Sequence, residues 1–269
     1  MQSVINYYNR FDEWGRLDRE PIEFQVNWHY IKKYLPNTGH LLDNGAGPGK
    51  YSMELAKEGY KVTLTDLTPR LVEIAKAKAV ELNLGEQFEG FYTADATDLN
   101  MLPDGHFDGA LMLGPMYHLQ EEKDRAKALE ELNRVTKTDG IVFVAFMPRM
   151  KHIFASLMSP GNWMPNDNMD AILQFSKTGC FNHADEGRFT GAYYFNIEDI
   201  NPLMEAHGFE NIELLGSNVG AILSNDLWTY WREKGEKEVE AIMNLIKEKA
   251  ADPSILGVSS HLLYIGRKR

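Results

Sequence analysis

Three glycines alternate within residues 40–52, His-Leu-Leu-Asp-Asn-Gly-Ala-Gly-Pro-Gly-Lys-Tyr-Ser. The leucine pair predicts a short buried strand, and the residues after the loop predict a helix. Glycine tolerates positive φ and has no Cβ, so Gly45, Gly47 and Gly49 would let the chain turn tightly and leave room for a ligand against the main chain. A strand, a glycine loop and a helix in this order predict a ligand-binding α/β unit.

The rest of the chain repeats this alternation of apolar runs with amphipathic stretches. Further strands are predicted at residues 61–65, 88–93, 107–113, 141–146, 209–215 and 261–266, and helices at 50–58, 71–84, 121–136, 197–207 and 223–250. Thr68 is predicted to cap the second of these helices. Strands that alternate with helices indicate a doubly wound, mostly parallel sheet, here with seven strands. We expect one α/β domain over residues 1–269, with a ligand-binding core at 37–147 and the rest of the sheet at 193–269.

The first 36 residues are predicted to be mostly helical, with aromatic residues recurring at near-helical spacing. Such a stripe is often plain core packing. Tyr7, Tyr8 and Trp14 are nevertheless enough aromatic surface to close over a ligand. We therefore expect this segment to act as a helical lid.

Residues 148–192 interrupt the alternation with short helical pieces rich in Met, Asn, Gly and aromatics. This insertion leaves the fifth strand at its ligand-facing end, so it is predicted to roof the site. Adaptable methionines and stacking aromatics suit recognition of a small apolar or aromatic substrate. An enclosed pocket under Trp163 and Met164 would exclude a polypeptide.

Charge and cysteine content exclude several functions. The formal net charge of −11 would repel a phosphate backbone, and the only basic cluster is the tail at 267–269, so we expect no nucleic-acid partner. Cys180 is the only cysteine, which excludes a disulfide within the chain, and no histidine pair has metal-ligand spacing. The start lacks the order of a signal peptide and no apolar run could span a bilayer, so we expect a cytoplasmic protein without membrane contact.

Carboxylates stand at three predicted strand ends. Asp66, about twenty residues after Gly45, is placed to accept hydrogen bonds from a ribose diol. Asp95, followed by Ala96, could accept from an adenine amino group, although it could also serve a turn. Asp43 precedes the first glycine, where a carboxylate favours a cationic ligand over a phosphorylated one.

The spacing of the loop argues against two common nucleotide motifs. A dinucleotide fingerprint requires glycine at the sixth position from Gly45, and that position is Lys50. The loop is also not closed by a lysine followed by serine or threonine, so a triphosphate loop is absent. An NAD-dependent oxidoreductase is therefore disfavoured.

Together, these motifs resemble the class I S-adenosylmethionine-dependent methyltransferases, and in particular small-molecule enzymes similar to the ubiquinone and menaquinone biosynthesis methyltransferases. The resemblance covers residues 41–146. It is carried by Leu-Asp-Asn-Gly-Ala-Gly-Pro-Gly at 42–49, by Asp66, by Ala-Asp-Ala at 94–96, and by Phe-Asp-Gly-Ala-Leu-Met-Leu-Gly at 107–114.

The resemblance implies that S-adenosylmethionine is the cofactor and S-adenosylhomocysteine its product. The methionine end would lie on the glycine loop, with its ammonium near Asp43, while Asp66 would hold the ribose and Asp95 with Ala96 the adenine. The full set of expected cofactor-binding residues is Tyr8, Asp43, Gly45, Ala46, Gly47, Gly49, Asp66, Leu67, Asp95, Ala96, Leu113 and Gly114.

Transfer of a methyl group from a sulfonium is an in-line displacement, so positioning and exclusion of water matter more than a strong base. Tyr117 is a candidate to stabilise the sulfonium through its aromatic face. His118, just after the fourth strand, could take a proton from a hydroxyl acceptor, or it could cap a helix or pack below the cofactor.

We expect methyl transfer to a small-molecule acceptor, at oxygen or nitrogen, by a monomer or homodimer. Gly-Pro-Met-Tyr at 114–117 lacks the asparagine of the Asn-Pro-Pro-Tyr motif, which weakens the case for planar nitrogen. The alternatives are methylation of a protein side chain and a non-catalytic protein that senses S-adenosylmethionine.

Overall fold

A single seven-stranded sheet organises the chain in the computed structural model, which describes residues 2–19, 21–185, 188–219 and 225–269. Its strand order is β3-β2-β1-β4-β5-β9-β8. The strands are β1 (His40–Asn44), β2 (Lys61–Asp66), β3 (Phe88–Thr93), β4 (Phe107–Met112), β5 (Thr136–Phe146), β8 (Phe209–Gly216) and β9 (Leu262–Lys268). Strand β9 alone runs antiparallel to its two neighbours, and the other strand pairs are parallel. The predicted doubly wound, mostly parallel sheet is confirmed.

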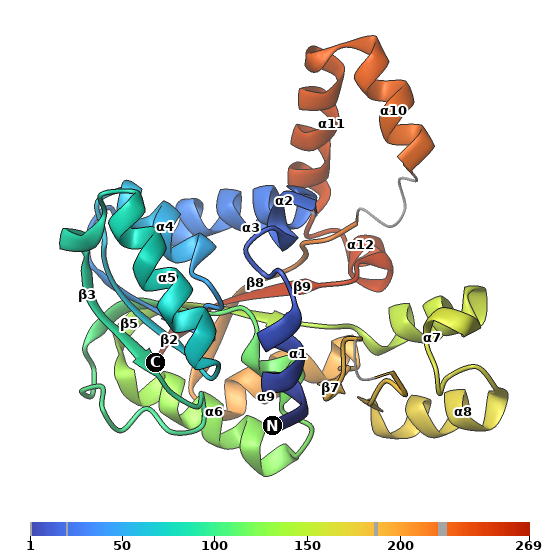
Figure 1. Ribbon diagram of the computed structural model, residues 1–269, viewed down its shortest axis with the longest axis horizontal. Coiled ribbons are helices and arrows are strands. Elements are labelled where there is room, and N and C mark those ends of the chain that lie inside the picture. The colour runs from blue at the N-terminus through green and yellow to red at the C-terminus, as the bar shows by residue number, and fades with distance from the viewer. Residues whose placement is uncertain (1, 20, 186–187, 220–224) are drawn as a thin grey trace.

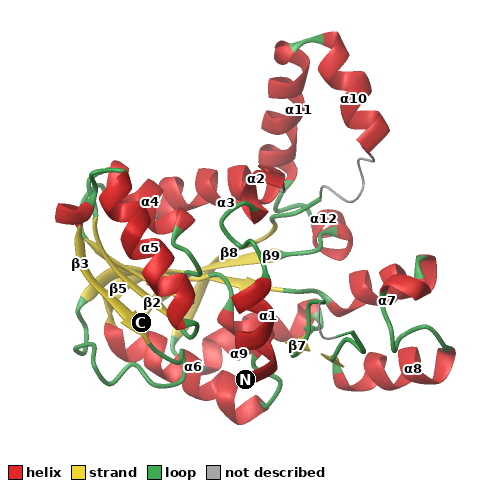
Figure 2. Cartoon of the chain, viewed as in Figure 1, coloured by secondary structure: helices red, strands yellow, loops and turns green. Residues whose placement is uncertain are grey.

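Helices cover both faces of this sheet (Figures 1 and 2). The helices of the sheet layers are α3 (Pro21–Tyr34), α4 (Lys50–Lys57), α5 (Pro69–Glu81), α6 (Glu122–Val135) and α9 (Ile197–Ala206). One core lies beneath α6 and α9, where Leu129, Leu132 and Ile200 are fully buried against the sheet. The other lies beneath α3 and α4 and includes Ile31 and Leu55. Two buried faces explain why β4 and β5 are nearly continuous apolar runs.

Some details of α5 and β5 differ from the sequence predictions. Helix α5 ends at Glu81 rather than residue 84, and Thr68, although at the N-cap position, makes no side-chain capping hydrogen bond. Strand β5 begins at Thr136, where the sequence predicts a helix end and a turn. The turn prediction has a basis, since Asp139 adopts a positive φ of 63° within the strand.

Residues 2–19 form α1 (Gln2–Arg10) and the short α2 (Arg16–Arg19), joined by a turn. Helix α1 crosses in front of the sheet near the carboxyl ends of its strands (Figure 1). Backbone contacts between α1 and α5 place this segment over the second βα unit. The predicted helical character of residues 1–36 is confirmed for the described part.

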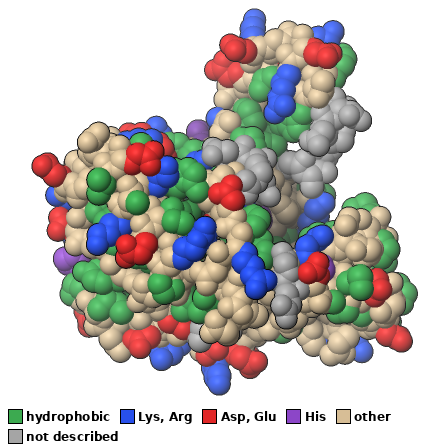
Figure 3. Space-filling view, in the orientation of Figure 1, with side chains coloured by type: hydrophobic (Ala, Val, Ile, Leu, Met, Phe, Trp, Pro, Cys, Tyr) green, Lys and Arg blue, Asp and Glu red, His purple; other side chains and the backbone are tan. Residues whose placement is uncertain are grey.

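Two helical lobes project from the sheet domain. The insertion after β5 contains α7 (Arg149–Met158), α8 (Met169–Thr178) and a small pair of strands, β6 (Cys180–Phe181) and β7 (Ala192–Tyr193), which the sequence did not predict. Between β8 and β9 lie α10 (Asn225–Lys234), α11 (Glu236–Lys249) and α12 (Pro253–Val258). The start of the helical stretch predicted at 223–250 falls outside the described residues. The α10–α11 arm and the α7–α8 lobe stand apart, with the surface hollowed between them, and acidic and basic side chains are interspersed over the face shown (Figure 3).

Candidate functional site

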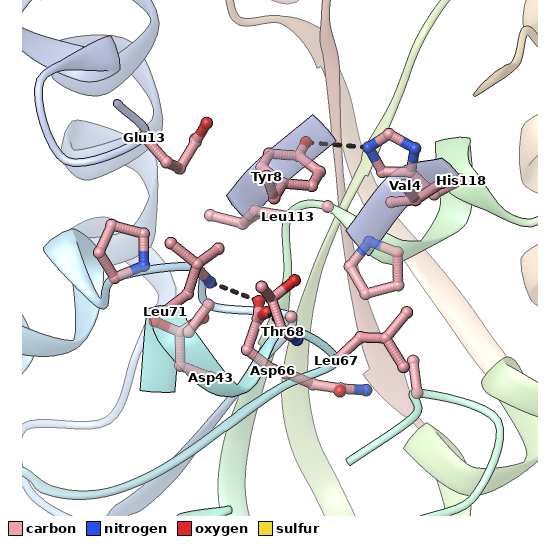
Figure 4. Close-up of a pocket in the computed structure, with 18 of the residues that line it drawn as sticks. Val4, Tyr8, Glu13, Asp43, Asp66, Leu67, Thr68, Leu71, Leu113 and His118 are labelled. Atoms are coloured by element: carbon pink, nitrogen blue, oxygen red, sulfur yellow. Dashed lines mark hydrogen bonds between the residues drawn. The ribbon is translucent and has the colours of Figure 1, made fainter. Parts of the chain in front are cut away.

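A pocket lies where the carboxyl ends of β1, β2 and β4 meet the N-terminal segment (Figure 4). A parallel sheet brings the residues that follow its strands to one edge, which is where ligands bind in such folds. The pocket residues therefore come from distant parts of the sequence. The predicted site residues that line it are Tyr8, Asp43, Gly45, Ala46, Gly47, Asp66, Leu67, Asp95, Ala96, Leu113, Gly114, Tyr117 and His118.

The glycine loop forms the floor through its main chain. The N–H groups of Gly45 and Ala46 both donate to the carbonyl of Thr65, at 2.8 and 3.0 Å, which pins the loop to β2. Gly45 has φ of 71°, and a Cβ there would overlap the ring of Pro115. Two requirements, a left-handed backbone and the close approach of the loop after β4, thus demand glycine at this position.

Gly49 is the one predicted cofactor residue that the pocket lining does not include. It caps the start of α4 with φ of 82°, and a Cβ would lie 2.8 Å from Cδ1 of Leu64. Its role here is to let α4 pack closely on β2. The sequence could not separate this packing role from ligand contact, because both require a glycine.

Asp66 ties the glycine loop to the next βα connection. Its Oδ2 accepts from the N–H of Gly47 at 2.7 Å, and its Oδ1 accepts from the N–H of Thr68 at 2.8 Å. Each carboxylate oxygen can accept a further hydrogen bond. Burial raises the pKa of Asp66, and the two main-chain donors oppose that rise. The carboxylate therefore organises the loop and can still accept from a ligand hydroxyl.

Asp43, at the end of β1, is only 2% exposed. Ser52 Oγ donates to its Oδ2 at 2.6 Å. Burial raises the pKa of the Asp43 carboxyl to about 7, although the hydrogen bond from Ser52 acts in the opposite direction. A buried carboxylate held this way gains strongly from a cation placed beside it.

Asp95 also combines a local turn with the pocket wall. Its Oδ1 accepts from both the N–H and the hydroxyl of Thr97, each at 2.9 Å. This is the turn chemistry that the sequence left open as an alternative. The residue nevertheless lines the pocket together with Ala96, so the two interpretations are compatible.

Tyr8 and His118 meet on one side of the pocket (Figure 4). The Tyr8 hydroxyl lies 2.9 Å from Nε2 of His118, and their rings contact edge to face with centroids 5.5 Å apart. Burial lowers the pKa of His118 to about 4, partly offset by the main chain of Gly191. The imidazole is therefore neutral at pH 7. This pair links α1 to the loop that follows β4.

Tyr117 is buried beside His118, and its hydroxyl donates to the carbonyl of Leu113 at 2.9 Å. Its ring centroid lies 5.1 Å from that of His118 and 5.7 Å from that of His261. This arrangement fixes the tyrosine ring at the pocket wall. A role for Tyr117 in stabilising a sulfonium stays a prediction.

The other aromatic residues expected over the ligand are elsewhere. Among the described residues that line the pocket, neither Tyr7 nor Trp14 appears. Tyr7 stacks on Phe11 at 5.1 Å, and Trp14 lies beneath the Nζ of Lys78 at 5.0 Å from the ring centroid. Of the three N-terminal aromatics, Tyr8 alone reaches the pocket within the described chain.

Trp163 and Met164, which were predicted to roof the site, do not line the described pocket. No residue from 148–185 or 188–192 lines the pocket. Trp163 instead packs on His152, with ring centroids 4.7 Å apart, inside an aromatic cluster of the insertion, while Met164 is 44% exposed. The insertion approaches the site through Phe189, whose ring lies 5.0 Å from that of His118, and through the main chain of Gly191. Its aromatic cluster continues to Tyr117 in the pocket wall.

Two charged residues of the N-terminal segment, Glu13 and Arg16, line the pocket and were not predicted from the sequence. Arg16 Nε donates to Oε1 of Glu13 at 2.7 Å, and its Nη1 lies 3.2 Å from both carboxylate oxygens of Glu23. The spacing of three between Glu13 and Arg16 could have suggested an ion pair. Nothing in it indicates that the pair lies against the glycine loop.

The charges of the pocket restrict what it can hold. Among the described lining residues, Glu13, Asp43, Asp66 and Asp95 are acidic, whereas Arg16 and Lys50 are the basic ones. An excess of carboxylates disfavours phosphorylated dinucleotides and favours a ligand with net positive charge. The donor and acceptor set thus fits a sulfonium nucleoside that carries an amino acid.

Comparisons with known proteins agree with this geometry. A family model described as a methyltransferase domain matches residues 42–144. A glycine/sarcosine N-methyltransferase from Parasynechococcus marenigrum is 31% identical over 239 residues, which cover 83% of this chain and 82% of that protein. A ubiquinone/menaquinone biosynthesis C-methyltransferase from Citrifermentans bemidjiense is 28% identical over 155 residues, covering 55% of this chain and 63% of that protein.

Among solved structures, the 1,6-didemethyltoxoflavin N1-methyltransferase of Burkholderia thailandensis, with its substrate and S-adenosylhomocysteine bound, matches with a TM-score of 0.58. The match covers 99% of this chain and 85% of that one at 16% identity, so it shows the shared fold. Within the described residues, no helix combines the length and apolarity needed to cross a bilayer.

Proposed function

Because this chain belongs to the class I S-adenosylmethionine-dependent methyltransferases, we propose that it methylates an amine nitrogen of a small molecule. The family supplies the cofactor and the methyl transfer. The acceptor and the attacking atom are the proposal. It rests chiefly on His118, which lines the pocket and contacts Tyr8. Its imidazole is only weakly basic, so it is poorly suited to take the proton of a hydroxyl acceptor.

The chain's own residues account for cofactor binding. S-adenosylmethionine, when bound, supplies a methyl group activated by its sulfonium. The glycine loop offers main-chain surface for the amino-acid end, and Asp66 has free acceptor capacity for ribose hydroxyls beyond its bonds to Gly47 and Thr68. Asp95 and Ala96 would receive the adenine. The acidic excess of the lining would compensate the positive charge of the sulfonium.

The choice of nitrogen follows from the state of His118. A hydroxyl nucleophile must lose its proton during attack, and a base with a pKa of about 4 accepts that proton poorly at neutral pH. A neutral amine attacks with its own lone pair and loses a proton afterwards. The hydrogen bond with Tyr8 then gives the imidazole a positioning role, holding α1 against the pocket. The name of the relative from Parasynechococcus marenigrum supports nitrogen as the acceptor atom.

A small acceptor is supported by the position of α1. Val4 and Tyr8 of this helix and Leu17 of α2 line the pocket together with the glycine loop, so the N-terminal segment forms part of its wall. A polypeptide would have to thread under that segment to reach the cofactor. Enclosure of this kind also keeps water from the reacting atoms.

The acceptor class can be tested with purified protein and S-adenosylmethionine. The panel would contain glycine, sarcosine, other primary and secondary amines, phenols, a quinol and a lysine peptide, with S-adenosylhomocysteine formation as the readout. We expect product above background with one or more small amines. Turnover confined to the phenols or the quinol, or to the peptide, would refute the proposal.

The mechanism can be tested by the pH dependence of the rate. If the acceptor's own lone pair attacks, kcat/KM should rise with pH until the acceptor amine is deprotonated, so two amines of different basicity should give shifted profiles. A protein base would instead impose one profile on both acceptors. Superimposable profiles would therefore contradict an attack that needs no base.

A further inference from the structure

One carboxylate oxygen in the pocket wall has no hydrogen-bond partner among the residues that the structure describes. Glu13 Oε1 accepts from Arg16, whereas Glu13 Oε2 is shielded from solvent and accepts no hydrogen bond from the described part of the chain. The side chain as a whole is 14% exposed. Buried polar atoms are nearly always satisfied in native structures, and an unsatisfied oxygen on a ligand pocket points to a donor that the ligand brings.

Glu13 lies directly over the glycine loop. A Cβ added to Gly47 would stand 3.3 Å from Cγ of Glu13. Asp66 is close enough for its charge to raise the pKa of Glu13, although burial is the main cause of that rise. The unpartnered oxygen is therefore near the stretch of main chain expected to hold the amino-acid end of the cofactor (Figure 4).

Glu13 also belongs to a cluster of ionisable side chains that contains a second carboxylate. Arg16 is shared between Glu13 and Glu23, so one guanidinium faces two carboxylates. His261 Nδ1 stands 3.2 Å from Glu23, but burial lowers the pKa of His261, which keeps it neutral. Asn218 donates to Glu23 at 3.4 Å and carries no charge. A ligand ammonium group placed beside Glu13 would therefore meet a favourable, acidic setting.

We propose that Glu13 accepts a hydrogen bond from the α-ammonium group of the cofactor's amino-acid end. Glu13 is then a cofactor-binding residue supplied by the N-terminal segment, outside the sheet-edge motifs. It recognises the amino acid rather than the nucleoside. The inference uses the family's cofactor and makes no use of the amine acceptor proposed above, so either can fail without the other.

The test is a thermodynamic cycle that removes the Glu13 carboxylate, the ligand's α-amino group, or both. Binding is measured by calorimetric titration. Wild type and Glu13→Gln would be titrated with S-adenosylhomocysteine and with its analogue that lacks the α-amino group. We expect loss of the amine to weaken binding to wild type about tenfold or more, and to change binding to Glu13→Gln less than twofold. Equal losses in the two proteins would overturn the proposal.

Two further variants locate the ammonium and control for general effects. If Asp43 alone holds the ammonium, loss of the α-amino group should hardly change binding to Asp43→Asn and should weaken binding to Glu13→Gln as much as to wild type. That result would overturn the proposal. Glu58→Gln removes an exposed carboxylate that pairs with Lys32 and should bind both ligands as wild type does.

A third ligand keeps the test valid if Glu13→Gln disturbs the fold. 5′-Methylthioadenosine lacks the whole amino-acid end, so Glu13→Gln should bind it with wild-type affinity. Glu13→Asp, which keeps the charge, should retain part of the amine dependence. If binding of methylthioadenosine falls as much as that of S-adenosylhomocysteine, the role of Glu13 is structural and the proposal fails.

Discussion

The hydroxyl of Tyr8 and Nε2 of His118 lie 2.9 Å apart although 110 positions separate them in the sequence. One residue belongs to the first helix and the other to the turn after β4. The contact therefore joins the N-terminal segment to the edge of the sheet at the cofactor pocket.

Removing the Tyr8 hydroxyl tests how much this contact holds α1 in place. Tyr8→Phe would leave Nε2 of His118 buried without a partner, so we expect the free energy of unfolding to fall by about 1 to 2 kcal/mol. Urea denaturation measures this directly. Tyr230→Phe, at a half-exposed ring on α10, is the matched control and should be neutral. Equal stability of the two variants would mean that the Tyr8–His118 bond adds nothing.

Gly45→Ala tests the main-chain requirement of the loop. The new methyl group would overlap the ring of Pro115 at a backbone φ of 71°, so the loop must move. We expect affinity for S-adenosylhomocysteine to fall at least tenfold and the unfolding free energy to fall by about 1 to 3 kcal/mol. Gly85→Ala has open space and no positive φ, so it should behave as wild type. Unchanged binding by Gly45→Ala would show that the loop does not contact the cofactor.

Cofactor binding should release protons near neutral pH. Burial raises the pKa of Asp43 to about 7 in the free protein, and a ligand of net positive charge lowers it again. Between the bound and free pKa values the complex holds fewer protons than the free protein, so affinity should rise with pH up to about 7 and level off above it.

Calorimetry in buffers of different ionisation heats would count the protons released on binding S-adenosylmethionine at pH 6.5. Asp43→Asn should release fewer protons on binding than wild type does. No difference in proton release between that variant and wild type would assign the protons to another group.

The aromatic cluster of the insertion should support its own lobe and not cofactor binding. Trp163→Ala removes a large ring that contacts His152 and Phe181. We expect a loss of about 2 to 4 kcal/mol in unfolding free energy, measured by denaturation, with affinity for S-adenosylhomocysteine unchanged within twofold. A large loss of affinity with intact stability would instead place the ring over the pocket.

The sheet and its carboxylates were predictable because they follow from periodicity and topology. Once the strands are parallel, Asp43, Asp66 and Asp95 must meet at one edge, whatever the details of packing. The position of β9 between β5 and β8 does not follow from the local sequence pattern, because periodicity does not give the order of strands in a sheet.

The contacts of the N-terminal segment and the insertion were less accessible from the sequence. Their positions depend on tertiary packing, which leaves little trace in local patterns. Tyr7 and Tyr8 are neighbours on α1, and only the orientation of this helix decides that Tyr8 faces the pocket. Likewise, Trp163 packs against His152 in the insertion and does not line the pocket.

The position of β9 has a consequence for biosynthesis. This strand is synthesised after the other strands of its sheet, and it pairs on one side with β5 and on the other with β8. Until it arrives, β5 presents an unpaired apolar edge and β8 has no neighbour in the sheet, so the nascent chain exposes surface prone to aggregation. A premature stop before residue 262 would remove an interior strand rather than trim a border, and would leave β8 detached from the other five strands of the sheet.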